Sequence, residues 1–293
     1  FTSGVMLVIG RIVAGLTKDG TSRVVAASLA AASGVFILRL LALLHPAKSM
    51  VDALFQAHRL EWVMAGRYFF TQPMPDGVAF PYAIGLYVFA APWAALTADH
   101  VALLRGVVTL MDVGATVVLA VALGRAWREG ASGAVAIVMS ALVPLPFVVV
   151  GNGNLTNAFG QSVALLALAA VASGLLSHRV LWTGAIFTAI VTLGLVSHVS
   201  TLTLLLAVLG LTAVGFLVLG RGVLTREAVV IVVATAVAVL LAFGLYYRHF
   251  TDVYREALTR VLSPAATMVP AQPVPGAGGQ VAALTRPLAW RER

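Results

Sequence analysis

Apolar runs of about 20 residues recur along this chain, and they constrain its fold more than any other feature. They lie at about residues 24–44, 101–124, 132–150, 158–176 and 228–247. At 1.5 Å per helical residue, such a run crosses roughly 30 Å, which is the thickness of the hydrocarbon core of a bilayer. The pattern predicts an all-α, polytopic transmembrane protein.

A further apolar stretch, residues 180–220, is about twice as long as one span requires and is interrupted at residues 197–201. It predicts two spans joined by a tight hairpin, which brings the total to about seven complete spans. Residues 1–16 form a shorter apolar run with Arg11 inside it. We interpret residues 1–23 as a partial span with a cytoplasmic turn, and the chain as part of a longer one.

Composition excludes the soluble classes. Of the 293 residues, 60% are apolar and 10% are charged, against roughly 25% charged in soluble domains. The absence of cysteine excludes a disulfide scaffold. The net charge of +8 comes from basic residues placed singly in short loops between apolar runs. We interpret that distribution as a membrane-topology signal rather than a nucleic-acid-binding surface.

Residues 80–96 form an apolar run that contains Pro81 and Pro92. Whether this run spans the membrane depends on the topology of the loops around it. If this run lies in the membrane interface instead of spanning, every basic loop falls on one side, as the positive-inside bias requires. Residues 45–100 then form one long extracytoplasmic segment with two interfacial helices. The basic loops are residues 18–23, 124–129, 178–179 and 221–226.

The most informative polar stretch is residues 49–68, which predict a helix that stops at Gly66. Helical spacing places Asp52, Gln56 and Arg59 on one face. Asp52, just beyond a span end, is well placed to take a proton from a polar group arriving from outside. The alternative is that Asp52 only favours the helix N-terminus.

This stretch and the elements after it carry a resemblance. Four elements follow one another here: the helix bearing Asp52, the turn Gly66-Arg67-Tyr68, the sequence Phe80-Pro81-Tyr82 that opens a short apolar helix, and Arg105. Together they resemble the first outer loop of the GT-C glycosyltransferases, particularly the protein O-mannosyltransferase-like branch. The order of elements over residues 24–220 is also similar. Ala53 stands where that family commonly has an acid, and Phe-Pro-Tyr where His-Pro-Pro is common. These departures leave metal use and donor type open.

The resemblance implies transfer of a sugar from a polyprenyl-phosphate-linked donor to an acceptor at the extracytoplasmic face, with Asp52 as general base. Residues 24–248 would form the GT-C-like module. The candidate phosphate-binding residues are Arg59, Arg67, His198 and Arg248, and the candidate sugar or acceptor contacts are His58, Tyr82, Asn152 and Asn154.

The same residues have simpler interpretations. Arginines at an interface often bind lipid headgroups or snorkel, His198 in a hairpin is equally often a cap, and residues 151–157 have an ordinary turn composition. Asp112 lies within a span, seven residues after Arg105, where the two charges would satisfy each other. The six histidines lack metal-ligand spacing, so we predict no metal site and no certain cofactor, while the family leaves a divalent cation open.

In the tail, residues 249–293, Tyr254 and Leu258 continue a helical spacing that begins at Tyr247. It predicts an extracytoplasmic amphipathic helix, followed by a Pro- and Gly-rich segment. Two other functions remain open: a transporter or flippase of a lipid-linked or anionic substrate, and a non-catalytic subunit of a larger membrane assembly. We expect a multi-pass protein of the cytoplasmic membrane with its active face outside.

Overall fold

Helices dominate the part of the chain that the computed structural model describes. That part comprises residues 34, 37, 41–42, 44–45, 52–73, 79–126, 135, 139, 145–177, 179–220 and 222–262. The predicted partial span lies outside the described residues, and the predicted spans at 24–44 and 132–150 lie largely outside them.

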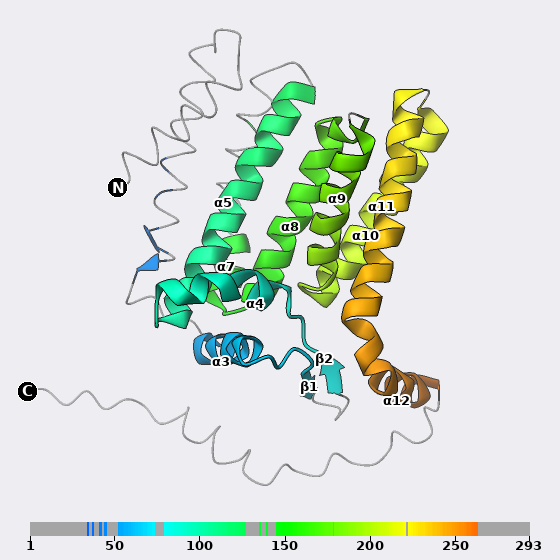
Figure 1. Ribbon diagram of the computed structural model, residues 1–293. Helices are drawn as coiled ribbons and strands as arrows, with labels where there is room; N and C mark the ends of the chain where they lie inside the picture. Colours follow the sequence, from blue (N-terminus) through cyan, green and yellow to red (C-terminus); the bar gives the residue numbers. More distant parts are fainter. Residues whose placement is uncertain are drawn as a thin grey trace, which may run out of the picture. The chain divides into compact units, whose positions relative to one another are not determined.

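Five long helices pack against one another (Figure 1). They are α5 (His100–Ala126), α8 (Leu155–Ala172), α9 (Val180–Leu195), α10 (Val199–Leu219) and α11 (Val223–Leu245). Helix α5 packs on α8, α8 on α9, and α9 and α10 both on α11. Helices α5, α8, α10 and α11 are long and apolar enough to cross a membrane.

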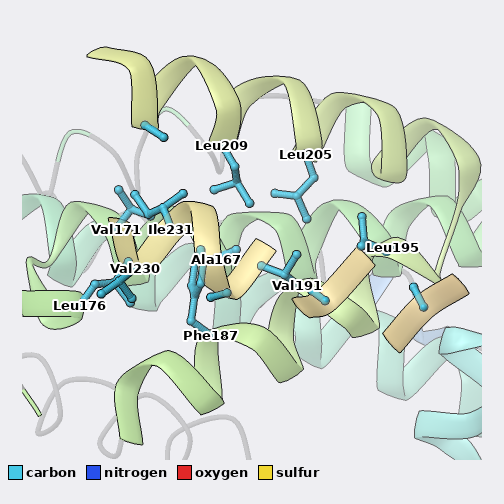
Figure 2. Close-up of a cluster of buried hydrophobic side chains, with 14 residues drawn as sticks. Ala167, Val171, Leu176, Phe187, Val191, Leu195, Leu205, Leu209, Val230 and Ile231 are labelled. Carbon is cyan, nitrogen blue, oxygen red and sulfur yellow. The ribbon is translucent and has the colours of Figure 1, made fainter. Parts of the chain in front are cut away.

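Helix α9 is shorter than the sequence led us to expect. Its 16 residues rise about 24 Å at 1.5 Å each, less than the roughly 30 Å of a hydrocarbon core. The total of seven spans therefore stays a prediction. The main core lies where α8, α9, α10 and α11 meet, and Figure 2 shows Leu205 and Leu209 reaching from α10 into this cluster.

The predicted hairpin between α9 and α10 is confirmed, with its turn at residues 196–198. The backbone amides of Ile84 and Gly85 both donate to the carbonyl oxygen of Val196, at 3.1 and 2.9 Å. Gly85 lies so close to Ser197 that a Cβ there would collide with the Ser197 side chain. The turn is thus fastened to the start of α4 (Gly85–Ala90).

Residues 45–100 contain the two helical segments expected, but also two strands that were not. Helix α3 spans Ala53–Met64, and α4 continues into the 3-10 helix η1 (Ala91–Leu96). Between them, β1 (Thr71–Pro73) and β2 (Ala79–Pro81) pair antiparallel, Gln72 opposite Phe80. Strands of three residues are too short to show an alternating pattern, so no periodicity in the sequence indicates them.

The chain divides into two compact units. The first comprises residues 1–70 and 82–249, and the second residues 71–81 and 250–293. Within the first, α3 packs on α4 and α5, and α4 packs on α8; α7 (Leu145–Gly151) also packs on α8 (Figure 1). Within the second, α12 (Thr251–Leu262) contacts β2. The 3-10 helix η3 (Tyr247–Phe250) joins α11 to α12.

Candidate functional site

The packed face of α3 buries two polar side chains, Gln56 and Arg59, together with Leu60 and Val63. Gln56 and Arg59 are only 2% and 8% exposed, whereas Leu54 on the other side is 71% exposed. Burial of polar groups costs free energy unless they are hydrogen-bonded or carry a function. The predicted helix is confirmed, and it ends before Gly66, whose φ is +77°.

Gln56 is the centre of a buried hydrogen-bond network. Its Oε1 accepts from the Tyr87 hydroxyl at 2.5 Å, and its Nε2 donates to the carbonyl oxygen of Gly153 at 2.8 Å. A longer contact of 3.5 Å joins Nε2 to the Tyr82 hydroxyl. Burial raises the pKa of the Tyr87 phenol well above its usual value, so this hydroxyl stays a donor. The network ties α3 to α4 and to the turn before α8.

Arg59 lies inside a cage of aromatic rings. Its guanidinium carbon is 4.2 Å from the ring centroid of Trp62, 4.7 Å from those of Phe55 and Phe70, and 5.6 Å from that of Tyr82. Burial lowers the pKa of Arg59 below its usual value. Its Nη1 is buried without a hydrogen-bond partner among the described residues, and no described carboxylate forms an ion pair with it. Among the described residues, therefore, aromatic ring faces rather than carboxylates surround this cation.

Asp52 stands exposed at the head of α3. It occupies the N-cap position, where a carboxylate favours the helix N-terminus, but its side chain makes no capping hydrogen bond. Gly153, with φ of +76°, approaches so closely that a Cβ there would lie 2.8 Å from the Asp52 backbone nitrogen. Asn152 and Asn154, both exposed, flank this contact. The structure thus brings Asp52 beside the amide-rich turn.

A second polar cluster joins the starts of α8 and α10. The Nδ1 of His198 accepts from the Ser200 backbone amide at 3.2 Å and lies 2.7 Å from the Ser200 hydroxyl. That hydroxyl is also 3.2 Å from Asn157 Oδ1, which accepts from Gln161 as well. His198 therefore caps α10, as its simpler interpretation predicted. Burial lowers the pKa of His198, which favours the neutral ring that a cap acceptor requires.

The last long helix ends at the same group of segments. The Tyr246 hydroxyl donates to the carbonyl oxygen of Tyr82, and the Tyr247 hydroxyl donates to that of Leu195 at 2.7 Å. The His249 ring stacks on Phe69, with centroids 3.8 Å apart. Five segments that are far apart in sequence therefore meet at one end of the first unit. They lie around residues 52–70, 82–87, 152–157, 195–200 and 246–249.

The other candidate residues are less integrated. Arg67 and Arg248 are exposed, and so is His58, which points away from the buried face of α3. Tyr82 contributes to both the Gln56 network and the Arg59 cage. The Nη2 of Arg105 donates to the carbonyl oxygen of His45 at 3.1 Å, and its pairing with Asp112 stays a prediction.

Sequence reasoning missed most of the partners that hold the site together. Gln56 was placed on the correct face, but the roles of Tyr87, Ser200 and Asn157 were not foreseen. The cage had a local signal: Phe55, Arg59 and Trp62 follow one another at helical spacings of four and three residues. Phe70 and Tyr82 join the cage through tertiary packing, which no local pattern reveals.

Within the described part of the chain, no group of three or more His, Asp or Glu side chains is arranged to hold a metal ion. Comparison with known proteins found no matching family model, no similar curated protein and no similar solved structure.

Proposed function

We propose that this chain is a membrane glycosyltransferase that moves a sugar from a polyprenyl-phosphate-linked donor to an acceptor at the extracytoplasmic face. The observation that carries the proposal is a pairing on α3. Asp52, an exposed carboxylate, is the N-cap of α3, and Arg59, seven residues later, is a buried cation that has no counter-ion among the described residues. Such a transfer needs a base to take the acceptor's proton and a cation to bind the leaving phosphate.

In the proposed reaction, Asp52 takes the proton of an acceptor hydroxyl as its oxygen attacks the anomeric carbon of the sugar. The bond from that carbon to the phosphate oxygen breaks, and the electron pair leaves with the phosphate. A phosphate is a good leaving group, so the main requirement is a cation to stabilise it. A divalent cation remains open as an additional partner of the phosphate.

Among the candidate phosphate partners, burial supports Arg59 most strongly. A desolvated guanidinium attracts an anion more strongly than an exposed one, because less water screens the charge. Arg67 and Arg248 are exposed and suit a weaker role at the lipid headgroups. His198 accepts at Nδ1, which leaves it neutral and able to offer only a ring N–H.

The acceptor side of the proposal rests on the turn beside Asp52. Asn152 and Asn154 expose amides on both sides of Gly153, and amides provide both donors and acceptors for sugar hydroxyls. Tyr82 and His58 are the other proposed contacts. Of these two, Tyr82 is linked to Gln56 and hence to the Asp52 helix.

Native mass spectrometry of the gently purified chain tests the proposal. We expect the Asp52→Asn variant to retain a glycosylated polyprenyl phosphate in larger amount than the wild type, because transfer has stopped. Asp99→Asn is the matched control: Asp99 is an exposed carboxylate of the same segment that caps α5 by accepting from the Ala102 amide, a bond that Asn preserves. Ordinary phospholipid alone in all three proteins would overturn the proposal and favour the transporter or subunit.

A further inference from the structure

Helix α12 follows α11 after a very short connection. Only Tyr246 separates Leu245, the last residue of α11, from η3, and α12 begins directly after η3. A 3-10 helix rises about 2 Å per residue, so the four residues of η3 advance about 8 Å. If α11 crosses the membrane, α12 must begin close to the level at which α11 leaves the hydrocarbon, whatever the direction of the connection.

One of the connecting residues suits that level. Arg248 is an exposed cation, and basic residues at the end of a span commonly reach the lipid headgroups. The rings beside it contact the protein instead: the Tyr246 and Tyr247 hydroxyls donate to the carbonyl oxygens of Tyr82 and Leu195.

Helix α12 itself has two different faces. Tyr254 and Leu258, four residues apart, lie on one face, whereas Asp252 and Glu256 lie on the opposite one. Burial raises the pKa of Tyr254, while Leu258 remains 59% exposed. Contact with β2 therefore leaves part of the apolar face uncovered.

The net charge of α12 indicates whether it would be attracted to anionic lipids. Residues 251–262 contain two acids, Asp252 and Glu256, and two arginines, Arg255 and Arg260, so their net charge is zero. A helix held by anionic lipids carries an excess of Lys and Arg on its polar face. Asp252 instead pairs with Arg255 at 3.7 Å.

We infer that α12 binds the lipid surface of the membrane, with Tyr254 and Leu258 directed toward the acyl chains and Asp252 and Glu256 toward water. Burial of the apolar face holds it there, rather than attraction to anionic headgroups. Helices of this type immerse their apolar face about 5–10 Å into the boundary between headgroups and acyl chains. The inference is independent of any transferase activity.

The absence of cysteine from the chain makes the test direct, because an introduced cysteine is the only thiol. Spin labels at Leu258→Cys and Glu256→Cys, both exposed positions, are compared in the full chain reconstituted into phosphatidylcholine vesicles. We expect the ratio of accessibility to oxygen over accessibility to a water-soluble nickel chelate to be several-fold higher at position 258. The ratio should not change when phosphatidylglycerol is added.

Three results would overturn the inference. Equal access of the nickel chelate to both positions would place α12 in water. Shielding of position 258 from oxygen and nickel alike would mean that protein covers this face. A ratio at position 258 that rises only when phosphatidylglycerol is present would show electrostatic rather than apolar binding.

Discussion

The side-chain amide of Gln56 donates a hydrogen bond to the backbone carbonyl of Gly153 at 2.8 Å, across 97 residues of sequence. The bond holds the turn before α8 against α3, where the Gly153 backbone meets Asp52. The position of Asp52, the candidate base, therefore depends on Gln56 and Gly153, to which the proposed reaction gives no chemical step.

Replacing Gly153 by Ala tests this close approach. The new Cβ would lie 2.8 Å from the Asp52 nitrogen, on a residue whose φ is +76°. Gly66→Ala is the matched control, because Gly66 has a φ of +77° but no atom within 4 Å of its Cβ position. Both variants bear the left-handed strain of about 1–2 kcal/mol. Thermal unfolding should show a clearly larger loss for Gly153→Ala, and equal losses would contradict the contact.

The Gln56 network predicts coupling between two buried side chains. Gln56→Leu leaves the Tyr87 hydroxyl and the Gly153 carbonyl without their partner, so we expect a loss of about 1–3 kcal/mol in the free energy of unfolding. Tyr87→Phe removes the same bond from the other side. Unfolding of the two single variants and the double variant completes a cycle. The double loss should fall short of the sum, whereas simple additivity would show that the bond contributes nothing.

The sequence was most informative about features that depend on residues close together along the chain. Twenty-residue apolar runs predicted α5, α8 and α11, and the polar interruption near His198 predicted the hairpin between α9 and α10. Helical spacing predicted that Asp52, Gln56 and Arg59 share a face; the structure buries Gln56 and Arg59 together on α3 and leaves Asp52 exposed at its N-cap. Each of these conclusions needs only neighbours along one element.

The sequence was least informative where distant segments meet. Helical spacing alone did not indicate that Gln56 and Arg59 are buried beside Leu60 and Val63, because polar side chains are mostly exposed. The reason is tertiary: Gly153 and Tyr87 supply the hydrogen bonds, and Phe70 and Tyr82 supply rings around Arg59. Tertiary packing brings these partners together, and a single sequence does not indicate which distant residues will be in contact.

Arg59 offers a test that separates ligand binding from stability. Arg59→Met keeps an apolar chain inside the cage but removes a buried charge that has no counter-ion in the part of the chain that the structure describes. The loss of cation–π attraction, about 0.5–2 kcal/mol, is offset in part by the removal of the desolvation cost of a buried charge. We expect stability to fall by no more than about 1 kcal/mol while retention of polyprenyl phosphate in native mass spectrometry is lost.

Arg226→Met is the control for that experiment, since Arg226 is an exposed arginine of α11 that the proposed site does not include. It should leave both stability and lipid retention close to those of the wild type. Undiminished lipid in Arg59→Met would remove Arg59 from the proposed phosphate site. A collapse of stability in Arg59→Met would identify the cage as a purely structural element.

His198 predicts how the stability of the hairpin depends on pH. Because burial lowers its pKa in the folded chain, the unfolded chain takes up the proton first as pH falls below about 6.5. Stability from this residue is therefore complete above that pH and decreases as pH falls through the lower, folded pKa. Protonation also removes the Nδ1 acceptor that caps α10.

Melting temperatures measured between neutral and mildly acidic pH test this dependence. His198→Asn keeps a capping acceptor but does not titrate, so its melting temperature should fall less steeply with acid than that of the wild type. His58→Asn replaces an exposed histidine of α3 and should keep the wild-type slope. If His198→Asn retained the full acid dependence while His58→Asn lost it, the assignment of the acid-sensitive group to the α10 cap would be wrong.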